Sequence, residues 1–275
     1  MKTQKEKGEI FQSLHQRSGC FVIPNPWDAG SSKLLSGMGF EALATTSAGL
    51  AFSLGKSDGT NGVSMDQALA NASDIVQATD LPVSADLENG YHDEPDGVFN
   101  TITNAAKIGL VGGSIEDATG DSSNPIYNFD LAVERIKAAA EAAKKLSCPF
   151  VLTARAENFL YGRPDLKDTI RRLQAFQDAG ADVLYAPGLK SHDEIATVVR
   201  EVDKPVNVLM GLAGVSITVQ ELTDLGVKRI SLGSSLNRAA LGAFLKATDE
   251  ILNKGSFTFS EDAATYADLN ERFSD

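Results

Sequence analysis

Short apolar runs and longer amphipathic segments alternate along almost the whole chain. The short runs are rich in Val, Ile, Leu and Ala, as expected for strands that are buried on both faces. The longer segments repeat apolar residues at helical spacing. The pattern predicts strands within residues 21–28, 41–47, 82–88, 112–117, 149–155, 181–187, 205–210 and 229–232, and helices over 4–18, 29–38, 64–79, 95–108, 130–145, 165–178, 192–201, 217–224 and 236–252.

After the first helix, strands and helices alternate without interruption. This order predicts parallel βα units wound into a closed (β/α)8 barrel of the TIM type, preceded by an N-terminal helix. No shift in composition marks a domain boundary, so residues 1–275 are expected to form a single domain. About residues 255–275 form a C-terminal extension with a helical piece near 260–272, which has no role in the barrel and is expected to pack on a neighbouring subunit.

The balance of charge narrows the choice of partners. The chain has 25 Lys and Arg against 37 Asp and Glu, for a net charge of -12, which argues against nucleic acid or an anionic membrane as partner. No apolar run follows the first residues, and none is long enough to span a membrane. Cys20 and Cys148 stand in apolar surroundings and are expected to be reduced core residues of a cytoplasmic protein.

The strand predicted at 82–88 changes from apolar to acidic at its carboxyl end. Side chains alternate between the two faces of a strand, so Ser84, Asp86 and Glu88 are expected on one face. Two carboxylates at the end of a buried strand repel each other and cost desolvation free energy, and a cation between them removes both effects. In barrels of this type the active site lies at the carboxyl ends of the strands.

Acids also stand at the ends of the neighbouring strands. The candidate metal ligands are Asp58, Asp86, Glu88 and Glu116. Oxygen ligands of this kind favour a hard cation such as Mg²⁺ or Mn²⁺. Each acid alone could instead be a solvated loop carboxylate, Asp58 above all. The 3 histidines are scattered along the chain and lack the spacing of a zinc site.

Arg155 ends the fifth predicted strand, with Thr153 and Glu157 on the same face by alternation. A guanidinium at the barrel mouth can grip a substrate carboxylate with two parallel hydrogen bonds. The alternative is an ion pair with Glu157 or another rim acid.

Residues 45–49, at the end of the second strand, supply hydroxyls and accessible backbone N–H groups. They either hold a carboxylate or carbonyl oxygen or simply form a tight turn. In the first case the residues that bind substrate are Thr46, Ser47, Ala48 and Gly49.

Several stretches together resemble a known superfamily. They are residues 25–29, 46–55 with Asp58, 86–91 (Asp-Leu-Glu-Asn-Gly-Tyr), 114–117 (Ser-Ile-Glu-Asp) and 154–159. Through them the chain resembles the isocitrate lyase/phosphoenolpyruvate mutase superfamily, clearly from the first to the fifth strand and weakly beyond. Members of that superfamily bind Mg²⁺ and 2-oxo acids or their enolates, and they cleave or form C–C or P–C bonds.

The resemblance implies roles for particular residues of this chain. The four acids would form the metal site, partly through waters, and Ser47, Ala48 and Arg155 would surround the substrate carboxylate. We also assign Asp86 and Asn207 to substrate binding. Members typically form tetramers that exchange the last helix between subunits, which implies a homotetramer or homodimer here.

The segment after the fourth strand departs from the superfamily pattern. The lyases carry a Lys-Lys/Arg-Cys-Gly-His motif there, whereas residues 118–125 contain neither Cys nor His, which argues against isocitrate-type cleavage by a thiol. The phosphonomutases carry a Lys followed two residues later by an Asn. Here Ser122 and Asn124 hold these positions, so a phosphoryl group would lack its cation. Asn124 is either a catalytic loop contact or a chance polar residue.

The features still predicted for the site are a metal ion and a pocket for a 2-oxo acid, with few residues suited to acid/base catalysis. We therefore predict an Mg²⁺-dependent lyase that acts on a small 2-oxo or 2-hydroxy dicarboxylate through a metal-stabilised enolate, above all by decarboxylation of an oxaloacetate-like acid. Retro-aldol or Claisen cleavage, of the 2-alkylmalate or 2-methylisocitrate type, would also need a base, for which Glu157, Tyr91 or a metal-bound water is the candidate. A P–C bond phosphonomutase or hydrolase is a further alternative.

Two rival classes differ from this prediction. A phosphosugar-binding barrel enzyme would use the glycines of 211–214 and 233–235, after the seventh and eighth strands; these glycines otherwise form barrel-closing turns. A non-catalytic metabolite-binding barrel is less favoured because the acids and Arg155 are all in place. A Schiff-base aldolase is least favoured, because the predicted strands hold no lysine able to point into the barrel.

Overall fold

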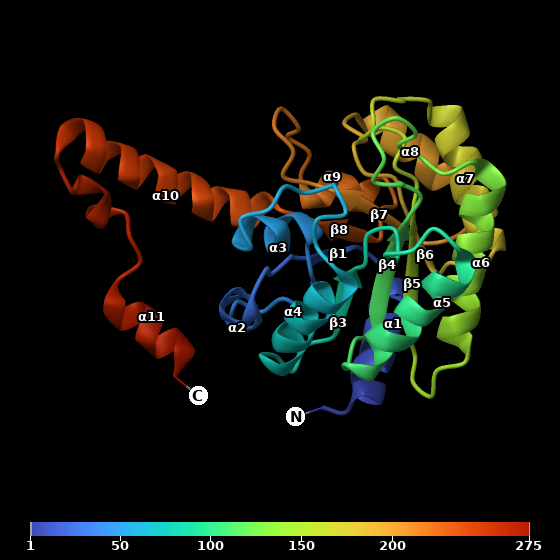
Figure 1. Cartoon of the computed structure of the whole chain (residues 1–275), viewed down its shortest axis with the longest axis horizontal. Coiled ribbons are helices and arrows are strands. Elements are labelled where there is room, and N and C mark those ends of the chain that lie inside the picture. The colour runs from blue at the N-terminus through green and yellow to red at the C-terminus, as the bar shows by residue number, and fades with distance from the viewer. Residues whose placement is uncertain (1, 275) are drawn as a thin grey trace.

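A computed structural model describes residues 2–274 of the chain. Within them, eight strands form one parallel sheet in the order β1-β8-β7-β6-β5-β4-β3-β2, with helices around it (Figure 1). The strands are β1 (Phe21–Ile23), β2 (Leu43–Ala44), β3 (Val83–Asp86), β4 (Gly112–Glu116), β5 (Val151–Arg155), β6 (Val183–Tyr185), β7 (Val206–Leu209) and β8 (Arg229–Ser231). The predicted (β/α)8 barrel is confirmed.

Except for α3, the helices follow the amphipathic segments predicted from the sequence. They are α1 (Gln4–Gln16), α2 (Ala29–Gly37), α3 (Ser47–Ser53), α4 (Met65–Gln77), α5 (Pro95–Lys107), α6 (Phe129–Lys144), α7 (Leu166–Asp178), α8 (His192–Glu201), α9 (Val219–Asp224) and α10 (Ser235–Lys254). Apart from α5 and α10, each starts after a residue whose side chain accepts a hydrogen bond from a free N–H group of the first turn. Thr3, Ser64 and Ser191 do so within reciprocal capping boxes.

The register of the ladder decides which side chains meet at the carboxyl edge of the sheet. Glu116 of β4 lies beside Arg155 of β5, and Asp86 of β3 lies beside Ser114 of β4. Side chains such as Leu152 and Ile115, which alternate with these, are fully buried in the hydrophobic core. Alternation therefore places the apolar set in the core and brings an arginine and two acids to one edge.

The barrel closes at β1 and β2 without a strand pairing. The N–H of Ala44 donates to the carbonyl oxygen of Pro24 at 3.1 Å. The side chain of Asn25 completes the closure: its amide donates to Thr45 O, and its Oδ1 accepts from the N–H groups of Leu232 and Gly233, each at 2.9 Å. A buried asparagine thus holds the ends of β2 and β8 together.

Helix α1 covers the floor of the barrel. Its Phe11 is fully buried and packs edge to face against His15 and Phe21. Nδ1 of His15 lies 2.8 Å from the carbonyl oxygen of Phe11, so Nδ1 is assigned the proton and Nε2 is left to accept from Arg229 at 3.4 Å. Burial and the charge of Arg229 lower the pKa of His15 to about 3.

This buried neutral histidine predicts a loss of stability in acid. The unfolded chain protonates His15 near its ordinary pKa of 6.5, whereas the folded chain does so only at about 3. Stability is therefore full above pH 6.5 and is lost as the pH falls from there towards 3, by about 2 kcal/mol at pH 5. Urea unfolding at pH 7 and pH 5 should show this loss in the wild type and not in His15→Gln. An equal loss in His15→Gln would contradict it, and the exposed His192→Gln is the control.

Two local predictions need correction. No helix was predicted between the strand at 41–47 and residue 64, whereas residues 47–53 form helix α3, which is capped by Thr46. The strand expected to run to residue 88 ends at Asp86, and Glu88 has a φ of 47°, so Glu88 has left the strand alternation. In addition, Cys20 and Cys148 are free but only partly buried, rather than core residues.

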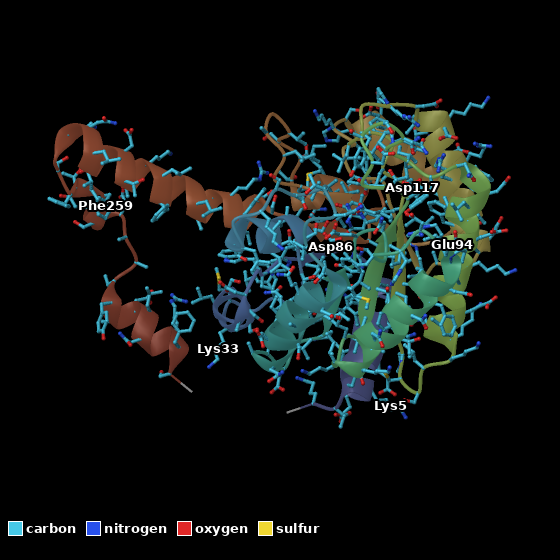
Figure 2. All side chains as sticks on the ribbon, in the orientation of Figure 1. Lys5, Lys33, Asp86, Glu94, Asp117 and Phe259 are labelled. Atoms are coloured by element: carbon cyan, nitrogen blue, oxygen red, sulfur yellow. The ribbon has the colours of Figure 1, made fainter. Side chains whose placement is uncertain are left out.

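The C-terminal residues form an arm outside the barrel. Helix α10 runs away from the barrel, and the chain returns through η1 (Thr258–Glu261) to α11 (Tyr266–Phe273), which contacts α2 (Figure 1). Figure 2 shows Phe259 on this arm and Asp86 near the centre of the barrel. Helix α11 starts later than the predicted 260–272. Among residues 2–274, no helix is long and apolar enough to cross a membrane.

Candidate active site

Arg155 stands at the centre of the barrel mouth and bonds three carboxylates. Its NH1 donates to Asp86 at 2.8 Å, its NH2 lies 3.0 Å from Glu116, and its Nε donates to Glu157 at 2.8 Å. The guanidinium also lies over the Tyr185 ring, 5.2 Å from the ring centre. The expected position of Arg155 is right, and so is the ion pair with Glu157 that was the alternative to substrate binding.

Asp86 is held in place by the loop and helix that follow β2. Its Oδ2 accepts from the backbone N–H of Ser47 at 3.1 Å and from the Ser47 hydroxyl at 2.9 Å. Its own N–H donates to the Thr45 hydroxyl at 3.0 Å. Ser47 is the first residue of α3, so the unpredicted helix brings its N-terminus to the acid.

Glu157 is fixed by a second set of charges behind it. Its N–H donates to Oδ1 of Asp117 at 2.8 Å, and Oδ2 of Asp117 accepts from Arg172 at 3.0 Å. Arg172 in turn bonds Asp168 at 2.9 Å. Burial raises the pKa of Glu157 to about 7, against the opposing effect of Arg155.

The loop after β3 keeps an unusual backbone conformation. Glu88 and Tyr91 have φ values of 47° and 60°, in the left-handed region that is costly for such residues. The fully buried Arg135 of α6 donates to the carbonyl groups of Asn89 and its neighbours in this loop. It also lies over the Tyr127 ring at 4.2 Å. Arg135 therefore holds the loop in place, a role that nothing in the sequence pattern indicated.

A small polar cavity of about 160 Å³ lies at the barrel mouth beside Arg155. The predicted substrate residues that line it are Thr46, Ser47, Ala48, Asp86, Arg155 and Asn207. Asp58 lines it as well. Gly49 does not: an added Cβ would lie 2.6 Å from Thr46 Cγ2 and 3.0 Å from Trp27 Cβ, so Gly49 serves close packing here. Its assignment to substrate binding stays a prediction.

Sequence reasoning missed other residues that line this cavity. Asn25, Tyr185, Arg229 and Ser231 all contribute to it. Arg229 and Ser231 start and end β8, and Tyr185 ends β6. Their alternation along short strands could have placed them inside the barrel, because residues two apart on a strand share a face.

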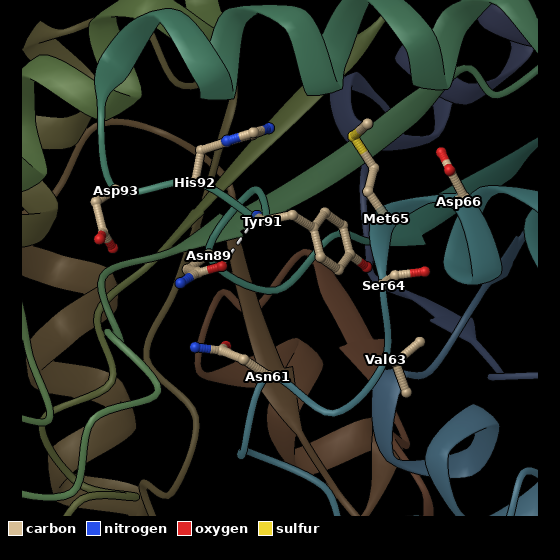
Figure 3. Close-up of a pocket in the computed structure, with 9 residues that line it drawn as sticks. All are labelled: Asn61, Val63, Ser64, Met65, Asp66, Asn89, Tyr91, His92 and Asp93. Atoms are coloured by element: carbon tan, nitrogen blue, oxygen red, sulfur yellow. Dashed lines mark hydrogen bonds between the residues drawn. The ribbon is translucent and has the colours of Figure 1, made fainter.

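Tyr91 reaches a neighbouring space. A second cavity of about 450 Å³ is lined by Tyr91 with Asn61, Asn89 and residues 63–66 and 92–93 (Figure 3). The Tyr91 hydroxyl is buried and has no hydrogen-bond partner within residues 2–274. Burial and the Glu88 charge raise its pKa well above the usual value. Tyr91 therefore keeps its proton at neutral pH and is better suited to donate one than to act as a base.

Asn124 lies away from both cavities. It is exposed on a short hairpin closed by the Ala118–Ile126 bridge, and its carbonyl oxygen accepts from the Thr119 hydroxyl at 2.6 Å. The polar groups of the hairpin form hydrogen bonds with one another, and the Asn124 side chain is exposed to solvent. The structure does not bring Asn124 to the other predicted catalytic residues.

The acids at the mouth carry more negative charge than Arg155 can balance. Burial and the charges of Asp86 and Asp58 raise the pKa of Glu88 to about 7. Burial and the charge of Asp86 also raise the pKa of Asp58. Oxygen donors with an excess of negative charge fit a hard divalent cation.

The four acids do not, however, form a ready-made cation shell. No group of three or more His, Cys, Asp or Glu side chains among residues 2–274 is arranged to hold a metal ion. The physical reason is that Asp86 and Glu116 both point at Arg155. Because Mg²⁺ commonly keeps several waters, a site of this kind needs few direct protein ligands.

The fold and this site define an enzyme-type (β/α)8 barrel with clustered acids around an arginine at its mouth. A family profile described as phosphoenolpyruvate phosphomutase matches residues 11–252. The chain belongs to the phosphoenolpyruvate mutase/isocitrate lyase superfamily, as the resemblance in sequence indicated. This superfamily contains lyases and mutases.

Individual relatives differ in the activity given in their names. An uncharacterised protein of Mycobacterium tuberculosis is 34% identical over 96% of each chain. A 2-methylisocitrate lyase of Shewanella oneidensis is 30% identical over 79% of this chain and 75% of its own. An oxaloacetate decarboxylase of Chromohalobacter salexigens is 24% identical over 98% of this chain and 94% of its own.

Solved structures share the fold over nearly the full length. A protein of Burkholderia cenocepacia J2315, provisionally described as a lyase/mutase, is 56% identical with a TM-score of 0.96 over 99% of this chain and 97% of its own. A 2,3-dimethylmalate lyase is 25% identical with a TM-score of 0.85, over 99% and 95%. A phosphonopyruvate hydrolase solved with oxalate and Mg²⁺ is 22% identical with a TM-score of 0.85 over 97% and 94%, a likeness of fold alone.

Proposed function

We propose that this protein is an Mg²⁺-dependent carbon–carbon lyase that decarboxylates a small oxaloacetate-like 2-oxo acid. The observation that supports the proposal is the excess of buried carboxylates around Arg155, beside a polar cavity of about 160 Å³. A cavity of this size suits a short acid rather than a sugar phosphate or a nucleotide. Mn²⁺ has the same preference for oxygen ligands and is the alternative cation.

Four acids would hold the cation, some of them through waters: Asp58, Asp86, Glu88 and Glu116. When bound, Mg²⁺ supplies Lewis-acid stabilisation of the negative charge that develops on the substrate as CO₂ leaves. The excess charge of these acids is the property of this chain that fits the ion.

The chain's own residues bind and orient the substrate. Arg155 offers planar N–H pairs that suit a carboxylate, once Asp86 and Glu116 are partly neutralised by the cation. Ser47 presents a backbone N–H and a hydroxyl at the same wall. Tyr91 keeps its proton but lines the neighbouring cavity and not the one beside Arg155, so the carbon that loses CO₂ takes its proton from solvent. Glu157 lies behind Arg155 and outside the cavity lining, so it is a positioning residue rather than a base.

Retro-aldol or Claisen cleavage of a 2-alkylmalate or 2-methylisocitrate is the second candidate. It is supported by the relatives with such names, and it requires a base that the cavity lining lacks apart from Asp58 and Asp86. P–C bond chemistry is the third candidate, and the cation expected of the phosphonomutases is absent from the exposed hairpin 118–126. The phosphosugar and non-catalytic classes are both disfavoured by membership of the superfamily.

A direct assay tests the decarboxylase proposal. Purified protein with Mg²⁺ should release pyruvate from oxaloacetate well above the rate of Mg²⁺ alone. EDTA should abolish the release, and added Mg²⁺ should restore it. Glu88→Gln should raise the Mg²⁺ concentration needed for half-maximal release, with the exposed Glu134→Gln of α6 as control. Turnover that persists in EDTA, or none with any 2-oxo dicarboxylate, would contradict the proposal.

We also propose that the arm joins subunits into a homodimer or homotetramer. Large apolar side chains on α10 and α11 are exposed, among them Phe244 at 63%, Leu252 at 83% and Tyr266 at 87%. Isolated soluble chains rarely expose so much apolar surface in one place. The cytoplasmic location expected from the sequence stays a prediction.

A further inference from the structure

Arg229 is a buried arginine inside the barrel, below the acids of the mouth. It begins β8, where it pairs in register with Asn207 of β7 and Phe21 of β1. Its side chain lies across the barrel interior, because its NH2 donates to the hydroxyl of Thr153 on β5 at 2.9 Å. Only 5% of the residue is exposed.

All of the partners that Arg229 has are neutral. Its Nε donates to Asn207 Oδ1 at 2.9 Å, and its NH1 donates to Nε2 of His15 at 3.4 Å. His15 is neutral because burial and this same guanidinium lower its pKa to about 3. Within residues 2–274 no Asp or Glu side chain forms an ion pair with Arg229, and Tyr185 is the one group whose charge raises its pKa.

An arginine in this state keeps its charge and has hydrogen-bonding capacity to spare. Burial lowers its pKa to about 10, so it stays protonated at neutral pH. Of the five N–H groups of a guanidinium, three have the partners just named, which leaves two. A buried cation without a counter-charge is costly, and a bound anion would offset that cost.

The free side of this arginine belongs to the cavity beside Arg155. Arg229, Asn207, Ser231 and Tyr185 are among the residues that line it. The Asn207 amide donates to the Ser231 hydroxyl at 2.9 Å. Two guanidinium groups therefore border one cavity of about 160 Å³, Arg155 among its acids and Arg229 among neutral groups.

We propose that Arg229, with Asn207 and Ser231, forms an anion subsite that takes the second carboxylate of a dicarboxylic substrate. The proposal rests on the proposed function for the other end of the substrate, which lies at Arg155 and the four acids. With this subsite the enzyme would bind a dicarboxylate more tightly than the acid in which a methyl group replaces the second carboxylate. Loss of one such charged contact removes most of that preference.

A matched pair of ligands tests the subsite. Malate and 2-hydroxybutyrate differ in that a carboxylate replaces a methyl group, and titration calorimetry with Mg²⁺ present gives both dissociation constants. We expect the wild type to bind malate at least about tenfold more tightly than 2-hydroxybutyrate. Arg229→Met should bring the ratio to about one, while Arg229→Lys should keep part of it. The exposed Arg200→Met of α8 carries the same loss of charge and should leave the ratio unchanged.

A second measurement separates this subsite from the proposed function. Acetate has no 2-oxo group and is not turned over, and comparison with Arg229→Met separates its binding at Arg229 from any binding at Arg155. In EDTA, with ionic strength held constant by sodium chloride, acetate should raise the melting temperature of the wild type and not that of Arg229→Met. This result would support the subsite even if no 2-oxo acid were turned over.

Other results would overturn the subsite. One is a folded Arg229→Met that still binds malate more tightly than 2-hydroxybutyrate. That result would refute the subsite without bearing on any measured decarboxylation. Another is an equal loss of affinity for malate and for 2-hydroxybutyrate in that variant, which would mean that Arg229 only supports the barrel. If Arg229→Met does not fold, the wild type is sufficient for the test: the proposal is overturned if acetate does not raise the melting temperature of the wild type.

Discussion

Replacing Arg155 by methionine is expected to lower the free energy of unfolding by about 3–5 kcal/mol at pH 8, because it leaves buried carboxylates without their cation. The guanidinium bonds Asp86, Glu116 and Glu157 at 2.8–3.0 Å, and its side chain is only 12% exposed. The three acids would then repel one another in a site from which water is largely excluded. Urea unfolding in EDTA measures this loss without interference from a metal.

The loss should depend on pH in a defined direction. The pKa of Glu157 is already raised to about 7 by burial, and Arg155 opposes that rise. An acid whose folded pKa lies above its unfolded value favours the fold below the unfolded pKa, and this contribution is lost as the pH rises through the folded pKa. Without Arg155 the folded pKa rises further, so Arg155→Met should be destabilised much less at pH 5 than at pH 8.

Turnover should fall with the same substitution. If Arg155 grips the substrate carboxylate, kcat/KM should drop by about 10²–10³-fold in Arg155→Met, with a partial return in Arg155→Lys. Arg171→Met is a control, since Arg171 is 58% exposed and bonds Asp168 at the surface. Equal stability of wild type and Arg155→Met at pH 8 would contradict the central ionic role of Arg155.

The regular part of the fold was predictable because its signals are periodic. Strand β5 was expected to end in Arg155, and it does, whereas its partner β4 ends at Glu116, one residue before the predicted end at Asp117. The local exceptions depend on tertiary contacts, which leave no periodic pattern in the sequence. Helix α3 begins where Ser47 meets Asp86, and Glu88 leaves the strand because the loop after β3 is held by Arg135 from α6, far along the chain.

The candidate site was predictable only in part, for a similar reason. Acids at strand ends are visible in the sequence, so Asp58 and Asp86 were found at the cavity. Arg229 was visible only as the first residue of a short strand. Its importance comes from neutral partners on α1, β5 and β7, which only the fold brings together. Asn124 shows the converse: alignment by count placed it at the site, whereas its hairpin folds onto itself.

Helix α10 carries a stripe of exposed apolar side chains, and charged substitutions in this stripe should disrupt an interface that it forms. Leu241, Leu245 and Leu252 are 39%, 64% and 83% exposed and recur at near-helical spacing, with Phe244 beside them at 63%. Burying such side chains stabilises an interface by roughly 1.5–3 kcal/mol each. The double substitution Leu245→Asp/Leu252→Asp should therefore turn an assembled wild type into monomers.

Sedimentation velocity or light scattering after gel filtration measures this change in mass. The change must come from the stripe and not from added charge, so Lys246→Asp, on the polar side of the same helix, is the matched control and should stay assembled. A monomeric wild type would refute the assembly proposal outright. If the double variant dissociates and also loses turnover while its barrel still melts cooperatively, the partner's arm must help to complete the site. Full turnover by the monomer would instead confine the arm to assembly, because every residue in the proposed site lies in the barrel of one chain.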